Sequence, residues 1–311
     1  MKQLIKNIIM LTISTIGIIA FFILWPKFNP TDAKIISTNF VGYDFARAVT
    51  GDATRAKMLI KPGTELHNYE PSPQDIIAIQ NAELFIYNGG ESDAWVDKIL
   101  EDNSISRDKT LRLMDFVDLK TEEKKEGMES EEEEEKEYDE HIWTSPKNAI
   151  RLIEVIRDKL AKIKADESES FHENARNYIE RIKDIDENFR VIIEAAPRKE
   201  LIFGDRFPFR YFVDEYGLDY YAAFPGCSDQ TEASSSTIAF LVDKVKSTGA
   251  KAVFKIELTN GQLAKTIAEE SGAKVYELNA AHNISEEEYT SGRTYADIME
   301  KNVDTLKEAL Y

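Results

Sequence analysis

The fold of this 311-residue chain is decided by one stretch, residues 166–196, which reads DESESFHENARNYIERIKDIDENFRVIIEAA. Apolar side chains recur in it at spacings of three and four, which is the pattern of an amphipathic helix. Such a helix would reach about 45 Å at 1.5 Å per residue, and Pro197 ends it. We interpret it as one helix that joins two domains; a coiled-coil dimer needs the same stripe and is the alternative. The stripe consists of Phe171, Ala175, Tyr178, Ile182, Ile185, Phe189 and Ile192.

On both sides of this helix, short apolar segments alternate with amphipathic ones, which predicts an α/β fold. We expect two lobes, each a mainly parallel four-stranded sheet flanked by helices. The lobes would cover residues 31–165 and 198–311, with the linking helix at 166–197. Strands are predicted at 34–37, 57–60, 84–87, 111–114, 201–203, 220–223, 252–256 and 275–278. Helices are predicted at 43–49, 73–81, 93–100, 208–216, 236–247, 263–270 and 295–310, and one begins at Ser145-Pro146.

The first 30 residues differ from the rest of the chain. Lys2 and Lys6 precede an apolar run from Ile8 to Trp25, close to the roughly 20 residues that span a bilayer. No small-x-small cleavage site follows it, so we expect an uncleaved signal anchor rather than a cleaved signal peptide. A buried core helix is the third interpretation. An anchor would place the protein on the outer face of the cytoplasmic membrane.

Charge and cysteine content exclude several classes of protein. The formal net charge is −18, which repels nucleic acid and attracts cations. A single cysteine, Cys227, excludes an internal disulfide and a four-cysteine zinc site. The acidic loop at 121–140 contains Glu131–Glu135, and we predict a solvated, mobile insertion in the first lobe. Such a loop either concentrates divalent cations weakly or only adds solubility.

Three of the four histidines fall in predicted loops after strands. His67 follows the second predicted strand, His141 ends the acidic loop, and His282 follows the last strand. Ligands of open α/β sheets bind beyond the carboxyl ends of the strands, and zinc accepts neutral imidazole nitrogens. These positions therefore indicate a metal site, with Asn68, Asp139 and Glu140 as groups that could orient the imidazole rings. His172 lies on the long helix and receives no role.

At these motifs the chain resembles a known family. HNYEPSP (67–73), IQNAELFIYNGG (79–90) and DEHIWTSPKNA (139–149) are similar to the extracytoplasmic zinc/manganese-binding proteins of metal ABC importers, the ZnuA-like cluster A-I lipoproteins. The resemblance spans the whole exported portion. It implies two α/β lobes joined by a rigid helix, with a metal ion in the cleft between them, and an acidic insert before the second histidine.

The second lobe departs from the family's pattern. In GDRFPFRY (204–211) the usual ligand position holds Arg206, which cannot coordinate metal, and a second ligand position holds Asn279. These features are similar to a Gram-positive branch of the family, and they make His282 the substitute ligand. Glu257 and Cys227 are the candidates for a fourth ligand, and the thiolate would favour zinc. Asp205 and Glu232 are expected to pair with Arg206 instead of binding the metal.

The resemblance therefore implies a monomeric, membrane-anchored, metal-binding component of an ABC importer for Zn²⁺ or Mn²⁺. Its partners would be a membrane permease and a cytoplasmic ATPase, and it would catalyse no reaction. Affinity for the ion should fall as the histidines protonate. A surface adhesin is one alternative. A zinc hydrolase is a weaker one, because the sequence has neither a His-Glu-x-x-His helix nor a Gly-x-Ser-x-Gly elbow.

Overall fold

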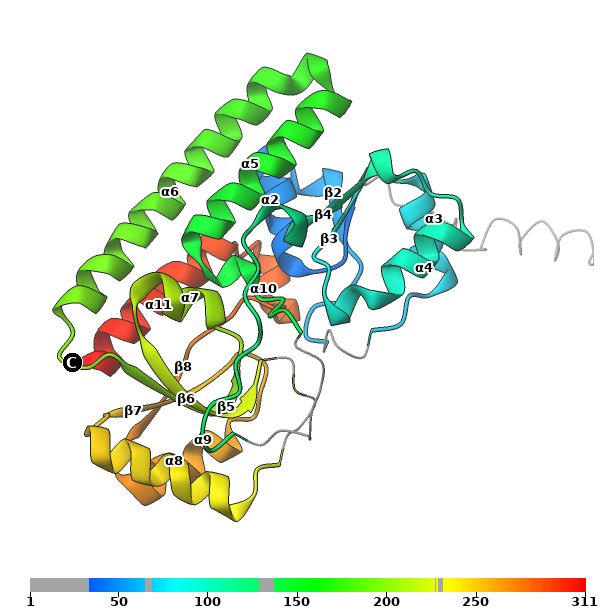
Figure 1. The fold of residues 1–311 in the computed structure, drawn as a ribbon. Helices are drawn as coiled ribbons and strands as arrows, with labels where there is room; N and C mark the ends of the chain where they lie inside the picture. The colour runs from blue at the N-terminus through cyan, green and yellow to red at the C-terminus, as the bar shows by residue number, and fades with distance from the viewer. Residues whose placement is uncertain (1–33, 65–68, 129–136, 227, 229–231) are drawn as a thin grey trace, which may run out of the picture. The chain divides into compact units, whose positions relative to one another are not determined.

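The computed structural model describes residues 34–64, 69–128, 137–226, 228 and 232–311. Residues 33–311 form one compact unit with two four-stranded parallel sheets, as expected (Figure 1). The predicted signal anchor, His67, Glu131–Glu135 and Cys227 lie outside the described residues. Among the residues that are described, no helix combines the length and the apolar character that a membrane span requires.

The first sheet has the strand order β2-β1-β3-β4. Its side chains alternate between two cores: Ile35 and Ile86 face α2 and α5, while Ile36 and Phe85 face α3 and α4. This alternation is what a strand buried on both faces requires. The elements are β1 (Ile35–Ser37), α2 (Phe40–Thr50), β2 (Ala56–Met58), α3 (Pro73–Asn81), β3 (Leu84–Tyr87), α4 (Ala94–Asp102), β4 (Thr110–Arg112) and α5 (Pro146–Ile163).

The second sheet has the strand order β6-β5-β7-β8, the same topology as the first. Ile202 and Val253 pack under α8 and α9, whereas Leu201 and Phe254 face the core shared with α7 and α11. The elements are β5 (Glu200–Phe207), α7 (Arg210–Tyr216), β6 (Asp219–Pro225), α8 (Ser235–Thr248), β7 (Ala252–Lys255), α9 (Gln262–Ser271), β8 (Lys274–Glu277), α10 (Glu286–Ser291) and α11 (Tyr295–Leu310).

The long helix α6 (Ser168–Ala195) joins the two halves and packs along α5, α2 and α11 (Figure 1). Its apolar seam is buried within the chain's own core, and this core also holds the inner faces of both sheets. The coiled-coil interpretation is therefore not needed. Tyr178 and Ile192 of the predicted stripe are only partly buried, and the next residue takes the buried place in each case. The buried seam is Phe171, Ala175, Ile179, Ile182, Ile185, Phe189 and Ile193.

Most predicted elements lie where the apolar pattern put them, and α3, β3 and α11 have the predicted bounds. The fourth strand is an exception. A strand was expected over 111–114, but β4 ends at Arg112 and a 3-10 turn spans Leu113–Phe116. The Met114 amide still donates to the carbonyl oxygen of Asn88, just after β3 (3.0 Å), although Met114 lies in the turn. A run of apolar residues does not reveal such a turn.

The flanks of the acidic loop are anchored to the rest of the chain by specific contacts, although Thr121 and Tyr138 are exposed. Thr121 pairs with Tyr138 in an antiparallel bridge, and the hydroxyl of Thr237 on α8 donates to the carbonyl of Gly127 (2.9 Å). The Lys125 ammonium pairs with Asp219 of β6. The dense negative charge of the segment as a whole indicated a solvated loop and gave no sign of these individual contacts.

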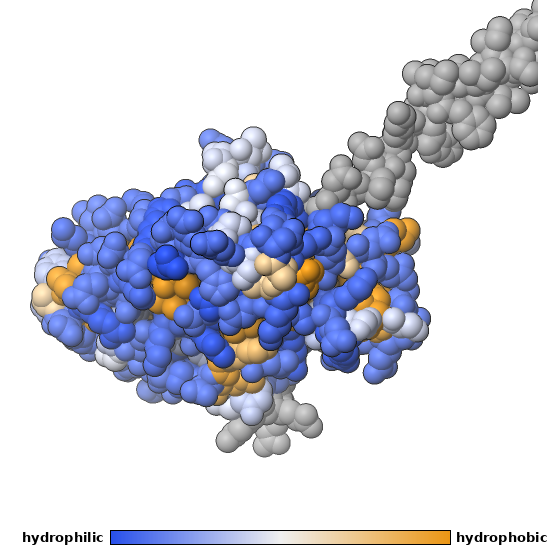
Figure 2. All heavy atoms as spheres, turned by 90° about the horizontal axis from the view of Figure 1, so that it is seen from above, coloured by the Kyte–Doolittle hydropathy of each residue, from blue (hydrophilic) through white to orange (hydrophobic). Residues whose placement is uncertain are grey.

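The face drawn in Figure 2 is mostly hydrophilic, with small separate apolar areas.

Candidate metal centre

The carboxyl ends of β1 and β3 build a hydrogen-bonded support for the loop that carries His141. The Asp93 carboxylate accepts from the amides of Asn88 (2.7 Å) and Gly89 (3.0 Å) and from the Thr38 hydroxyl (3.3 Å). Burial raises the pKa of Asp93 to about 6, although these donors lower it. The Asn88 side chain in turn donates to the backbone carbonyl of Glu140 (2.8 Å). The first sheet thus fixes the backbone next to His141.

Glu140 is buried and hydrogen-bonds to Ser92, which lies in the turn after β3. Its carboxylate accepts from both the hydroxyl and the backbone amide of Ser92. Burial raises the pKa of Glu140 to about 7. Gly90 has a φ of 83°, and a Cβ there would meet the Glu140 carboxylate at 2.5 Å. Only glycine fits beside this carboxylate.

The His141 ring is fully buried and is held by Asp139. One oxygen of Asp139 accepts from the backbone amide of His141 (2.8 Å) and lies 3.0 Å from its Nδ1. With the Nδ1 proton facing the carboxylate, Nε2 keeps its lone pair. This Nε2 is buried and has no hydrogen-bond partner among the described residues. A buried nitrogen without a partner is costly in a protein interior, so it marks a place for a ligand.

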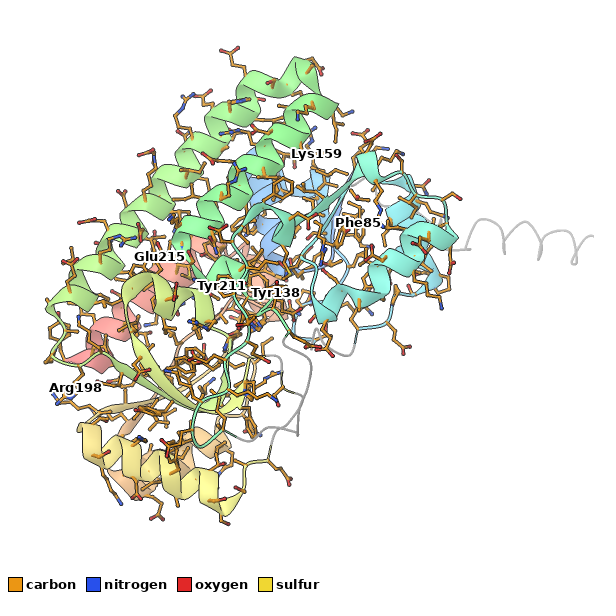
Figure 3. All side chains as sticks on the ribbon, viewed as in Figure 1. Phe85, Tyr138, Lys159, Arg198, Tyr211 and Glu215 are labelled. Atoms are coloured by element: carbon orange, nitrogen blue, oxygen red, sulfur yellow. The ribbon has the colours of Figure 1, made fainter. Side chains whose placement is uncertain are left out.

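The second lobe clamps the same loop. The Tyr211 hydroxyl on α7 donates to the carbonyl oxygen of Asp139 (2.7 Å), and Figure 3 draws Tyr211 beside this loop. The Trp143 indole donates to the carbonyl of Ala280 (2.6 Å), and the Tyr295 hydroxyl donates to the carbonyl of Trp143 (2.7 Å). The histidine from the first half is therefore fixed by residues of the second half.

His282 is held by a carboxylate from a neighbouring strand end. Glu257 follows β7, and one of its oxygens accepts from the His282 amide (2.9 Å) and lies 3.0 Å from Nδ1. The other oxygen accepts from the Ala280 amide (2.7 Å). Burial raises the pKa of Glu257, but the hydrogen bonds and the attraction to His282 outweigh it, and the net shift is downward. Both oxygens of Glu257 are therefore engaged within the chain.

The two imidazole rings meet where the lobes join. The ring centroids of His141 and His282 are 4.4 Å apart, with planes at 80°. The Trp143 ring lies at 5.7 Å from the first and 5.9 Å from the second, so an apolar wall borders the pair. The His282 side chain keeps 14% exposure, which leaves an approach from solvent. Two such nitrogens, each with a carboxylate behind its ring, suit a zinc-like cation.

The segment that leads to His67 is tied to the residues after His282. The Asn283 side chain donates to the carbonyl oxygens of Lys61 (2.8 Å) and Thr64 (2.9 Å). The Gly63 amide donates to the carbonyl of Ile284 (2.7 Å). Thr64, which is three residues before His67, therefore lies next to the candidate site.

The segment that leads to Cys227 also borders the site. A Cβ on Gly226 would lie 3.1 Å from Cε1 of His141 and 3.3 Å from the Asp139 carboxylate. The backbone immediately before the cysteine therefore touches the buried ring. Within the part of the chain that the structure describes, no three histidine, cysteine, aspartate or glutamate side chains surround a single point as metal ligands would.

Arg206, Asp205 and Asn279 support loops around the centre. Asp205 accepts from the Thr259 hydroxyl (2.8 Å), and the Arg206 guanidinium lies 3.4 Å from the carbonyl of Ser228. The Asn279 side chain accepts from the Ala281 amide (2.8 Å). Sequence reasoning missed Trp143 and Tyr211, because indole and phenol donors to distant carbonyls leave no local pattern. It named Glu257 as one of two candidates for a fourth ligand, but not as the partner of the His282 ring.

Two parallel sheets bridged by one long helix, with imidazoles from both halves close together, define a two-lobed α/β architecture with histidines where the lobes meet. The model of the family described as "Zinc-uptake complex component A periplasmic" matches residues 35–309. The chain belongs to this family, which consists of substrate-binding proteins.

Curated relatives agree with this assignment. The chain is 34% identical over 278 residues to the zinc-binding lipoprotein AdcA of Streptococcus pneumoniae, covering 88% of this chain and 55% of the relative. It is 31% identical over 279 residues to the high-affinity zinc uptake system protein ZnuA of Bacillus subtilis, covering 89% and 87%. The chain thus spans about half the length of the AdcA proteins that it matches.

Solved structures are also similar. The Zn(II)-bound ZnuA-like domain of S. pneumoniae AdcA superposes with a TM-score of 0.72 at 31% identity, covering 89% of this chain and 98% of that domain. The metal-dependent lipoprotein YcdH of B. subtilis gives a TM-score of 0.75 at 29% identity, covering 90% and 100%. These similarities confirm the predicted two-lobed α/β fold.

Proposed function

We propose that this chain is the extracytoplasmic zinc-binding component of an ABC importer, which captures the ion and delivers it to a membrane permease with a cytoplasmic ATPase. The observation that carries the proposal is the pair of imidazoles from separate lobes, 4.4 Å apart, with the Nε2 of His141 buried and without a partner. The zinc-binding relatives support it. The ion is the cargo of this protein, and no bond needs to be made or broken.

His67 is proposed as a further ligand because of the reach of the chain. Thr64 is hydrogen-bonded to Asn283, the neighbour of His282. Three residues span at most about 10–11 Å. His67 can therefore return to the imidazole pair from that anchor, and its position in HNYEPSP supports the same role.

Cys227 is favoured over Glu257 as the fourth ligand. Glu257 already accepts from two backbone amides and faces the His282 ring, so turning it to the metal would leave buried donors without partners. Gly226, which precedes the cysteine, touches the His141 ring. A thiolate beside imidazoles selects zinc over manganese, because manganese prefers oxygen ligands.

The apolar segment at 8–25 is proposed to keep the protein at the outer face of the membrane. Several relatives are described as lipoproteins or as periplasmic components, which supports a location outside the cytoplasm. An ion released from this component would have only a short distance to the permease.

Metal binding is tested by elemental analysis of protein purified without added metal and by calorimetric titration with zinc and manganese. One zinc per chain is expected, with zinc displacing manganese. The variant His67→Ala/His141→Ala should lose tight zinc binding while its circular dichroism is unchanged. His172→Ala removes an exposed histidine of α6 and is the matched control. Undiminished zinc affinity in the double variant would overturn the assigned site.

Import is tested in the source bacterium by deleting the gene and measuring cellular zinc in chelator-treated medium. Accumulation should fall and should recover with the wild-type gene but not with His141→Ala. Full recovery with His141→Ala, at equal protein level, would contradict an import role for this site.

A further inference from the structure

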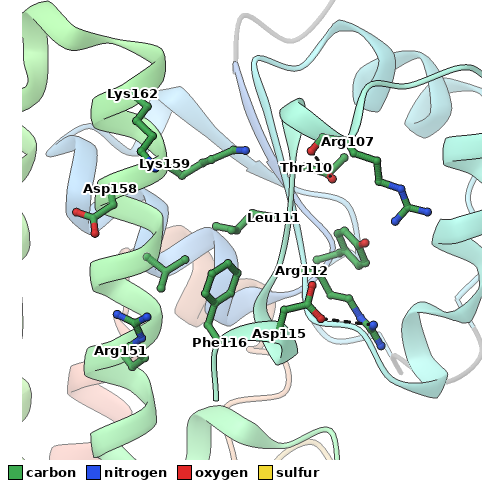
Figure 4. Close-up of a pocket in the computed structure, with 12 residues that line it drawn as sticks. Arg107, Thr110, Leu111, Arg112, Asp115, Phe116, Arg151, Asp158, Lys159 and Lys162 are labelled. Atoms are coloured by element: carbon green, nitrogen blue, oxygen red, sulfur yellow. Dashed lines mark hydrogen bonds and ion pairs between the residues drawn. The ribbon is translucent and has the colours of Figure 1, made fainter. Parts of the chain in front are cut away.

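A cavity with a basic lining lies on the first lobe, along the free edge of β4. β4 is the last strand of its sheet, and the cavity between it and α5 has a volume of about 460 Å³ (Figure 4). Five basic and two acidic side chains line it, although the whole chain has a net charge of −18. The charged lining residues are Arg107, Arg112, Arg151, Lys159, Lys162, Asp115 and Asp158.

The acids that line this cavity do not cancel its positive charge. Each lining arginine has an acidic neighbour: Arg112 pairs with Asp115 (3.5 Å), Arg107 with Asp97 (3.1 Å) and Arg151 with Glu154 (3.9 Å). Asp158 pairs with Arg157, which is not part of the lining (2.8 Å). Lys159 and Lys162, in contrast, have no acidic partner among the residues that the structure describes. Lys159 is half-buried, and Figure 4 shows its side chain extending from α5 toward β4. Two ammonium groups of this cavity are thus without a paired acid among the described residues.

The cavity also lies close to the point where the chain enters the lobe. Ile35 of β1 pairs with Leu84 of β3, and the next residue of β3 pairs with Thr110 of β4. Strands are about 4.8 Å apart, so the start of β4 lies roughly 10 Å from the start of β1. Lys164, directly after α5, pairs with Glu83 directly before β3 (2.9 Å). The lysine-bearing end of α5 and the entry of the chain therefore share one end of the lobe.

We propose that this basic cavity binds the phosphate group of an anionic phospholipid headgroup. Guanidinium and ammonium groups are the usual partners of phosphate. A lysine near an anionic membrane contributes about 1 kcal/mol, or roughly fivefold in affinity. Such a contact would orient the first lobe on the membrane. The chain as a whole is negatively charged, as the lipid is, so the basic cavity is the part suited to face it. It rests on the proposed location at the membrane, but not on zinc binding.

The test uses the full chain in lipid nanodiscs and a water-soluble amine-acylating ester, with labelling rates read by mass spectrometry. Lys159 and Lys162 should label about fivefold more slowly in phosphatidylglycerol discs than in phosphatidylcholine discs. High salt should abolish the difference, because exposed charges are screened. Lys265 of α9, on the second lobe, is the control and should label equally in both discs. The Arg151→Gln variant should weaken the protection of Lys159.

Two results would overturn the proposal. Equal labelling of Lys159 and Lys162 in both discs would show that the cavity takes no headgroup. Protection by inorganic phosphate in phosphatidylcholine discs, as strong as that in phosphatidylglycerol, would assign the cavity to a soluble anion instead. Labelling is measured both with and without zinc. Failure of headgroup binding can therefore be distinguished from failure of zinc binding.

Discussion

The two imidazole–carboxylate pairs have the same chemistry but are built in different ways. Asp139 lies two residues before His141 in one loop, so a short turn brings its carboxylate to both the amide and the ring. Glu257 and His282 are 25 residues apart and meet because their strands, β7 and β8, are neighbours in the sheet. One pair depends on local sequence, and the other depends on the fold of the whole second lobe.

This difference explains how each pair is secured. The local pair is clamped from outside, by Tyr211 on the carbonyl of Asp139. The distant pair secures its own loop, because Glu257 also accepts from the amide of Ala280. Among the non-glycine residues that the structure describes, positive φ occurs at Ser104 and at two residues of the distant pair's loops: Leu258 (59°) follows Glu257, and Ala281 (59°) precedes His282.

The largest expected effect is the loss of either imidazole. Structural zinc sites are worth about 10–16 kcal/mol, so an equal share among four ligands is roughly 2.5–4 kcal/mol each. His141→Ala and His282→Ala should each weaken zinc binding by roughly 100- to 1,000-fold. Competition with a chelating dye measures this. If one variant binds as wild type while the other does not, the two lobes do not share one ion.

Next are the carboxylates behind the rings. Glu257→Gln and Asp139→Asn should weaken zinc binding by about 10- to 100-fold. The Glu257 change should be the larger, because its oxygens hold two amides and a ring rather than one amide and a ring. Titration calorimetry on both variants gives the ranking. A larger loss in Asp139→Asn would contradict this account of the second pair.

The indole that bridges the two pairs should act mainly on stability. Trp143→Phe removes the donor to the carbonyl of Ala280 and leaves that oxygen without a partner in a buried position. The cost should be about 1–3 kcal/mol in the free energy of unfolding. Urea denaturation of the variant measures it. The surface variant Lys183→Gln on α6 should show no change, and an equal loss there would show that the assay does not resolve this contact.

The smallest effect concerns the backbone of the distant pair. Glycine tolerates positive φ without a steric cost, although it gains entropy in the unfolded chain. Ala281→Gly should therefore raise the free energy of unfolding by at most about 1 kcal/mol. Thermal denaturation measures this free energy. A decrease of more than about 1 kcal/mol in the free energy of unfolding would mean that Ala281 is not strained.

The sequence predicted local features well. Strands, helices and the positions of the histidines follow from apolar spacing and from loops after strands, and Asp139 was recognisable because it lies beside His141. It could not predict which oxygen of a distant strand faces a given ring. Glu257 was therefore named as one of two candidates for the fourth ligand, without its contacts to His282 and the backbone. The clamps by Trp143 and Tyr211 were missed for the same reason.

The most direct test of the central claim is an anomalous difference map, recorded at the zinc edge, from crystals of the zinc-loaded protein. One peak is expected, at about 2.0–2.1 Å from Nε2 of both His141 and His282. A peak bound to neither ring, or rings that have moved apart with separate ions, would contradict a single metal centre shared by the two lobes.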